Sequence, residues 1–195
     1  MYKDMTEVLL EKEQNGWKLE KFEVKNDDLL YAFRSGVDPG NYIRLMHDGK
    51  LVMSDTDMEK RTNAEFCSKA HGDVLIGGLG IGLIVLAIQD KPEVNSITIL
   101  ECNQDVIDLV ATQLPLNNKV KIVNADVFTW KPDKGIRYDT IYMDIWPLIS
   151  KEIYQKEMRV LKKKFARYLK SKDLNPNRFN KCWAEYYAKT ERPLF

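Results

Sequence analysis

Four short runs of apolar and β-branched residues in the middle of the chain predict the strands of a buried sheet. They cover residues 73–77, 96–101, 120–124 and 138–143. Residues 83–89 and 104–114, which lie between them, carry enough apolar side chains for helices. Strands that alternate with helices imply a parallel sheet, right-handed crossovers and a ligand crevice at the carboxyl ends of the strands. We therefore predict an α/β, Rossmann-like doubly wound core that begins near residue 72.

The first 70 residues have a different pattern, which predicts a small antiparallel sheet. Residues 16–24 and 29–33 are candidate strands. Residues 42–53 predict a hairpin, because the Asp48-Gly49 pair at its centre tolerates the positive φ that a tight turn needs. Residues 63–70 are expected to form a helix that leads into the first core strand.

The C-terminal segment contains no further β-branched run and predicts helices. Apolar residues at spacings of four and three share one helical face: Tyr154, Met158, Leu161, Phe165 and Tyr168. An Asn-Pro-Asn sequence interrupts the helical pattern before residues 179–189. We expect this aromatic-rich segment to pack back onto the core. The chain thus divides into an N-terminal hairpin region with its lead-in helix (1–70), the Rossmann-like core (71–150) and a basic helical segment packed on the core (151–195).

A cluster of glycines after the first predicted strand indicates a nucleoside-binding loop. This loop contains Gly77, Gly78, Leu79, Gly80 and Gly82. Glycines at the end of a buried strand allow a tight turn and a close approach of the backbone to a ligand. A dinucleotide fingerprint would need glycine or alanine at position 83, where this chain has Leu. The spacing instead resembles motif I of the class I S-adenosylmethionine (AdoMet) methyltransferases, whose seven-stranded core looks truncated here.

The resemblance implies AdoMet as the cofactor and gives roles to residues at the ends of the following strands. Glu101 would hold the ribose hydroxyls, and Asp126 would accept a hydrogen bond from the adenine amino group. Cys102, Asn124 and Val127 would complete the cofactor site. An ordinary solvated carboxylate at a strand end is the alternative for Glu101.

A hairpin followed by an AdoMet core resembles the spermidine synthase branch of this superfamily over residues 40–147. Small bacterial and phage proteins of that type share further elements, namely Thr62-Asn63, the Gly-Leu-Gly-Ile-Gly-Leu loop and Asp144-Ile-Trp-Pro147. True aminopropyltransferases carry a second acid where this chain has Trp146, so one carboxylate that would hold a polyamine is missing. Aminopropyl transfer is therefore an alternative and not the favoured function.

The Asp144-Ile-Trp-Pro147 stretch also resembles, loosely, the acceptor motif of amine-directed methyltransferases. By that likeness Asp144 orients an amine, and Trp146 packs on the acceptor or on the sulfonium methyl, which is attracted to an aromatic face. A core ring that caps the sheet is an equally good interpretation of Trp146. The sequence favours an AdoMet-dependent methyltransferase with Asp144 and Trp146 as catalytic residues and an amine or other small nucleophile as the acceptor. A non-catalytic AdoMet-binding or nucleoside-binding module is the other class that stays open.

Composition and residue counts argue against a disulfide-stabilised, metal-binding or membrane protein. With 44% hydrophobic residues the chain can form a real core without disulfides. Three separated cysteines and two histidines give no metal-ligand spacing, so no metal is expected. The absence of a signal-like N-terminus and of an apolar stretch near 18 residues predicts a cytoplasmic protein that does not contact a membrane.

The charge is unevenly distributed. Residues 151–195 carry a net charge of +8, whereas the whole chain carries +1. A basic helix could bind the phosphates of a nucleic acid, but a helix packed on the sheet with a solvated basic face has the same pattern and is favoured. The expected partner is a small-molecule acceptor, and a homodimer stays open.

Overall fold

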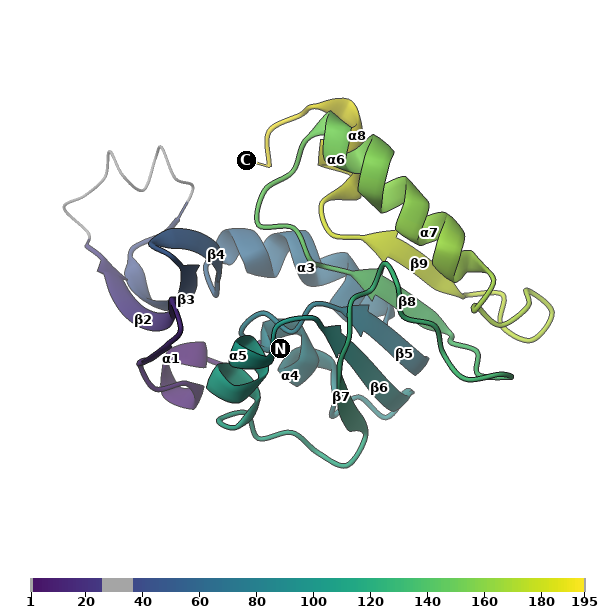
Figure 1. Cartoon of the computed structure of the whole chain (residues 1–195), viewed down its shortest axis with the longest axis horizontal. Coiled ribbons are helices and arrows are strands. Elements are labelled where there is room, and N and C mark those ends of the chain that lie inside the picture. Colours follow the sequence, from purple (N-terminus) through teal and green to yellow (C-terminus); the bar gives the residue numbers. More distant parts are fainter. Residues whose placement is uncertain (1, 26–36, 195) are drawn as a thin grey trace.

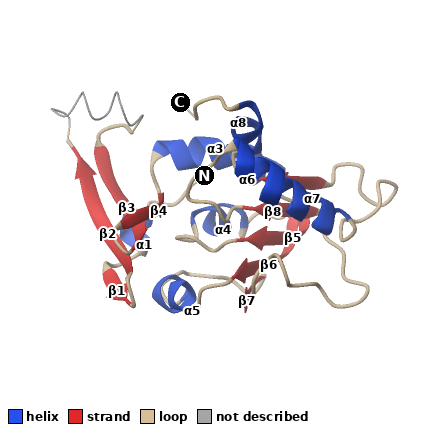
Figure 2. Ribbon diagram, turned by 45° about the horizontal axis from the view of Figure 1, so that its top comes forward, coloured by secondary structure: helices blue, strands red, loops and turns tan. Residues whose placement is uncertain are grey.

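The computed structural model describes residues 2–25 and 37–194, which form two sheets lying side by side (Figures 1 and 2). One sheet is antiparallel with the strand order β1-β2-β3-β4, and the other is parallel with the order β7-β6-β5-β8-β9. The predicted α/β class with a small antiparallel sheet is confirmed. The candidate strand at residues 29–33 lies outside the described residues.

The N-terminal sheet contains the predicted hairpin. The elements of this region are α1 (Met5–Val8), β1 (Lys12–Gln14), β2 (Trp17–Val24), β3 (Gly40–His47) and β4 (Lys50–Ser54). Asp48 and Gly49 form the β3–β4 turn with φ values of 48° and 74°, as the sequence predicts. The short α1 and β1 were not expected from the sequence.

The parallel sheet is built by the four predicted strands. They are β5 (Gly72–Gly77), β6 (Val94–Glu101), β7 (Val120–Asn124) and β8 (Thr140–Met143). The crossovers contain α4 (Leu83–Ile88) and α5 (Gln104–Val106), which continues as a π-helical turn, η1 (Ile107–Ala111). The helix before β5 is α3 (Asp57–Lys69), which begins earlier than the predicted start at residue 63. All four strands end at the same edge of the sheet because they are parallel.

A fifth parallel strand corrects the prediction that no strand follows Asp144. After α6 (Lys151–Ile153), η2 (Tyr154–Met158) and α7 (Arg159–Ala166), the chain returns as β9 (Phe179–Cys182) beside β8, and α8 (Glu185–Thr190) follows. The sequence of β9 is Phe-Asn-Lys-Cys, and only its two end residues are buried. An edge strand of this kind lacks the continuous apolar run by which buried parallel strands are recognised.

Helices cover both faces of the parallel sheet. Val74 and Ile76 of β5 belong to a core cluster on one face with residues of α3, α4 and η1, whereas Leu75 belongs to a cluster on the other face with η2 and α7. The first cluster continues into the antiparallel sheet through Leu19 and Ile43. The two sheets therefore share one hydrophobic core. No helix among the described residues is long and apolar enough to cross a membrane.

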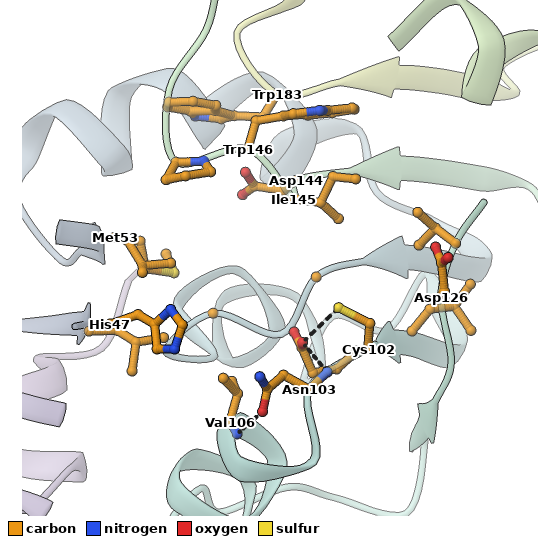
Figure 3. A pocket seen from close by; sticks show the side chains of 18 of the residues that line it. His47, Met53, Cys102, Asn103, Val106, Asp126, Asp144, Ile145, Trp146 and Trp183 are labelled. Carbon is orange, nitrogen blue, oxygen red and sulfur yellow. Dashed lines mark hydrogen bonds between the residues drawn. The ribbon is translucent and has the colours of Figure 1, made fainter. Parts of the chain in front are cut away.

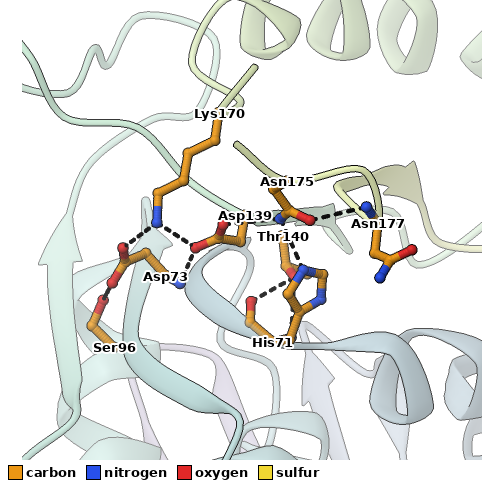
Figure 4. A network of polar contacts seen from close by, with 8 residues as sticks. All are labelled: His71, Asp73, Ser96, Asp139, Thr140, Lys170, Asn175 and Asn177. Carbon is orange, nitrogen blue, oxygen red and sulfur yellow. Dashed lines mark hydrogen bonds and ion pairs between the residues drawn. The ribbon is translucent and has the colours of Figure 1, made fainter. Parts of the chain in front are cut away.

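A polar network at the amino ends of β5 and β8 attaches the C-terminal segment to the core (Figure 4). Lys170 forms ion pairs with Asp73 at 3.0 Å and with the buried Asp139 at 2.7 Å. Asn175 donates to the other oxygen of Asp139 at 2.9 Å and also contacts the ring of His71. Lys170 thus belongs to an internal network and not to a free basic surface.

Candidate active site

A cavity of about 600 Å³ lies where the carboxyl edge of the parallel sheet faces the antiparallel sheet (Figure 3). Its volume is in the range of ligand-binding pockets. The predicted site residues that line it are Gly78, Gly80, Glu101, Cys102, Asp126, Val127, Asp144 and Trp146. The predicted residues that lie outside its lining are Gly77, Leu79, Gly82 and Asn124. The cofactor and acceptor roles of all these residues stay predictions.

The glycine loop follows a left-handed backbone, with φ values of 95° at Gly78, 52° at Gly80 and 79° at Gly82. A Cβ at Gly78 would collide with the carbonyl oxygen of Asp144, and one at Gly80 would collide with the sulfur of Met53. The N–H of Ile81 points at the same Met53 sulfur, 3.1 Å away. Backbone packing and the positive φ therefore require glycine at position 78, whereas at position 80 the positive φ and the Met53 side chain disfavour any other residue.

Glu101 joins the glycine loop to the loop after β6. One carboxylate oxygen accepts a hydrogen bond from the N–H of Leu79 at 3.0 Å, and the other accepts from the N–H of Asn103 at 2.9 Å. The side chain of Asn103 in turn caps α5 by accepting from the N–H groups of Asp105 and Val106. The thiol of Cys102 donates a long hydrogen bond of 3.8 Å to the same oxygen as Asn103. A carboxylate oxygen has two lone pairs, so the oxygen that accepts from Leu79 can still accept a hydrogen bond from a hydroxyl group.

Asp126 lies at the far end of the cavity, after β7. It is exposed, and its carboxylate accepts a hydrogen bond from the N–H of Phe128 at 2.7 Å. The neighbouring Val127 is buried and supplies an apolar wall. Asn124 ends β7 beside Glu101 in register, but its side chain is exposed outside the cavity. This end of the site therefore combines apolar contacts with hydrogen-bond acceptors, as a nucleoside requires.

Two further acidic side chains, Asp144 and Glu59, line the cavity. Asp144 follows β8, and its N–H donates to the carbonyl of Gly77 at 2.8 Å. Burial raises the pKa of Asp144 to about 7. Glu59, on α3, is only 6% exposed, and burial together with the charge of Asp144 raises its pKa to about 8. Perturbed carboxyls of this kind are typical of functional sites.

Sequence reasoning missed Glu59, although a signal was present. Glu59, Asn63 and Phe66 are spaced by four and three, and all three are buried on one face of α3. The predicted helix began at residue 63 and therefore did not include the acidic member of this face. A charged residue on the buried face of a helix is unusual and would have indicated a site.

Two tryptophans form the upper wall of the cavity in the view of Figure 3, where their rings are seen edge-on above the Asp144 carboxylate. The indole N–H of Trp146 donates to Glu157 at 2.7 Å, and that of Trp183 donates to the hydroxyl of Thr62 at 2.9 Å. Trp146 is both a core residue and a lining residue, and its contact with an acceptor or a sulfonium methyl stays a prediction. Trp183 directly follows β9 and was not predicted.

The antiparallel sheet supplies the remaining wall. Met53 and His47 line the cavity, and the His47 ring stacks on Trp17 with 4.2 Å between ring centroids. None of these residues was predicted to belong to the site. Among the described residues, no group of three His, Cys, Asp or Glu side chains is arranged to hold a metal ion.

Comparison with known proteins identifies the family. A family model described as guanidinoacetate N-methyltransferase matches residues 38–190. The chain belongs to the guanidinoacetate N-methyltransferase family. Its match to the Polyamine aminopropyltransferase 1 of Streptomyces coelicolor has 30% identity over 140 residues, which are 61% of this chain and 26% of that protein. The chain therefore spans about a quarter of the length of this relative.

Solved structures of N-methyltransferases are similar to the chain. The N-methyltransferase NodS from Bradyrhizobium japonicum, in complex with S-adenosylhomocysteine, has 13% identity, covers 60% of this chain and 59% of its own chain, and gives a TM-score of 0.47. The glycopeptide N-methyltransferase MtfA, in complex with AdoMet, has 18% identity. The match covers 62% of this chain and 47% of the MtfA chain, with a TM-score of 0.44. Membership of the family confirms the predicted resemblance to AdoMet-dependent methyltransferases and the predicted cofactor.

Proposed function

We propose that this chain transfers a methyl group from AdoMet to a nitrogen atom of a small acceptor that is held by Asp144 and Glu59. The observation that carries the proposal is a pair of acidic side chains, the buried Glu59 and the partly buried Asp144, that line the same cavity as the nucleoside contacts and have raised pKa values. The family takes its description from an enzyme that methylates nitrogen, and a nitrogen acceptor for this chain agrees with that description.

The residues at the nucleoside end fit AdoMet. Glu101 is held in place by two backbone donors, and the oxygen that accepts from Leu79 has a lone pair left for a ribose hydroxyl. The backbone at Gly78 and Gly80 lines the cavity without side chains, and Val127 would pack on the adenine. AdoMet supplies a methyl group that its sulfonium already activates, so the protein has mainly to align the reactants.

Asp144 and Glu59 would perform two tasks. As carboxylates they would hold a protonated or partly charged nitrogen by charge-assisted hydrogen bonds. The acceptor must also lose a proton when its lone pair forms the new N–C bond. A carboxylate whose pKa is raised to about 7, as for Asp144, is a suitable base near neutral pH, and the N–H proton would pass to it.

A small acceptor is favoured over a nucleic acid because several basic side chains of residues 151–170 are engaged within the protein. Lys162 pairs with Glu185, and Lys164 donates to the carbonyl of Val127 at 2.6 Å. Lys170 belongs to the network with Asp73 and Asp139 described above. Aminopropyl transfer is not favoured, since the second acid of that chemistry is replaced by Trp146.

The test combines binding and turnover. AdoMet is titrated calorimetrically into the protein, and transfer of labelled methyl to a panel of small amines and guanidines is then measured. We expect AdoMet to bind, and Asp144→Asn to abolish turnover while AdoMet affinity changes less than threefold. The exposed Asp133 supports a matched control, Asp133→Asn, which should change neither quantity. AdoMet binding without turnover on any nitrogen compound would favour the binding module instead.

A further inference from the structure

The two tryptophans at the acceptor end have their polar edges occupied by the protein. Each indole has a single N–H donor. In Trp146 that donor is bound by Glu157, and in Trp183 by Thr62, with good hydrogen-bond distances of 2.7 and 2.9 Å. Neither ring can therefore offer a hydrogen bond to a molecule in the cavity. What they present to the cavity is apolar and aromatic surface.

Both rings are also rigidly placed. Trp146 is 7% exposed and packs in the cluster formed with η2 and α7, whereas Trp183 is 4% exposed and belongs to the other core cluster. The N–H of Trp183 on the main chain donates to the carbonyl of Met143, the residue before Asp144, at 2.8 Å. The aromatic wall is thus fixed to the same strand end that carries the carboxylate.

A site of this composition discriminates between cations. The oxygens of Asp144 and Glu59 can accept hydrogen bonds from the N–H groups of either a primary or an alkylated ammonium ion. Trp146 and Trp183 offer no acceptor, so their faces are matched by alkyl groups and not by further N–H groups. The alkyl groups of an alkylated ammonium ion carry part of the positive charge and can contact aromatic faces through dispersion and cation–π attraction.

We infer that Trp146 and Trp183 form an aromatic roof over Asp144 and Glu59 that selects acceptors whose nitrogen already carries alkyl groups. This inference rests on the proposed function and specifies its substrate class. The roof favours secondary and tertiary amines over primary amines, and it retains contact with the nitrogen as methyl groups are added.

The experiment uses two probes with the same charge, methylammonium chloride and trimethylammonium chloride. Each is titrated into the protein saturated with S-adenosylhomocysteine, and the indole N–H signals are followed by NMR. We expect trimethylammonium to bind about 5- to 30-fold more tightly, which is the effect of a desolvated cation–π contact. The signals of Trp146 and Trp183 should shift, whereas that of Trp130, which lies outside the cavity lining, should not.

Variants test whether the preference for trimethylammonium depends on the aromatic roof. Trp183→Leu should remove most of the preference for trimethylammonium. Because Trp183 is a core residue, Thr62→Val serves as a second variant that only releases the ring, and it should reduce the preference about two- to fivefold, as expected for one lost hydrogen bond. Trp130→Phe is the matched control and should leave the preference unchanged.

The outcomes separate this inference from the proposed function. Equal affinity for the two probes, or an unchanged preference in both Trp183→Leu and Thr62→Val, would overturn the aromatic roof while S-adenosylhomocysteine still binds. Failure of the wild-type protein to bind S-adenosylhomocysteine would overturn the proposed function itself.

Discussion

The carboxyl pair of Asp144 and Glu59 should lower the stability of the folded protein above neutral pH. Both groups have a higher pKa in the folded state than in the unfolded state, about 7 against 3.8 for Asp144 and about 8 against 4.5 for Glu59. Between these values the folded state binds more protons than the unfolded state. The free energy of unfolding therefore falls as the pH rises through this window, and it is constant above the folded pKa.

The size of the stability loss follows from the pH range between the unfolded-state and folded-state pKa of each group. Each pH unit within a window corresponds to about 1.4 kcal/mol. Between pH 5 and its folded pKa, Asp144 therefore accounts for a loss of about 3 kcal/mol, and Glu59 for about 4 kcal/mol. The two groups interact, so removing both should recover less than the sum.

The amide variants Asp144→Asn and Glu59→Gln remove one titrating group each. We expect their stability relative to the wild type, measured by urea denaturation, to rise by about 3 and about 4 kcal/mol between pH 5 and pH 8.5. Both should lose turnover. Asp133→Asn should follow the wild-type pH dependence. A relative stability of Asp144→Asn that stays flat across this range would refute the conclusion that its carboxyl is held in a desolvated site.

Three further perturbations test other parts of the structure. Gly80→Ala should weaken AdoMet binding at least tenfold, because its Cβ collides with Met53 and the left-handed backbone disfavours alanine; calorimetry that shows unchanged affinity would contradict this. Glu101→Ala should lower both AdoMet affinity and stability, the latter by about 1–3 kcal/mol, because two backbone donors lose their acceptor; a loss of neither would exclude its bridging role. Lys170→Met should cost about 2–3 kcal/mol in urea denaturation, since the buried Asp139 loses its cation, with AdoMet affinity unchanged; a change in affinity would mean that this network communicates with the cavity.

The sequence was most informative where one segment contained the whole signal. Buried parallel strands read as continuous apolar runs, so β5, β6, β7 and β8 could be located, and the glycines with Glu101 and Asp126 could be assigned to one edge of the sheet. The strand β9 gave no such run because it lies at the edge of the sheet and buries only Phe179 and Cys182.

Apart from Asp144 and Trp146, the residues of the acceptor end could not be predicted because tertiary contacts bring them there. Glu59 looks like an ordinary charged helix residue until the packing of α3 buries it in the cavity lining, where the charge of Asp144 raises its pKa. Trp183 becomes part of the site only because β9 pairs with β8 and places the following residue beside Met143. Met53 contacts the glycine loop across a gap of more than twenty positions in the sequence, which no local pattern records.

The origin of the cavity residues shows that the chain forms its site as one unit. The wall made by Met53 and His47 comes from the antiparallel sheet, Glu101 and Asp144 come from the parallel core, and Trp183 comes from the C-terminal segment. The same three segments contribute to a single hydrophobic cluster, so the packing that positions one wall also positions the others. Because a buried carboxyl is tolerated only when its surroundings are held in place, the costly pair at the acceptor end depends on this shared core. Neither the hairpin region nor the C-terminal segment is therefore an accessory to a complete nucleotide-binding core, since each supplies a wall that the core lacks.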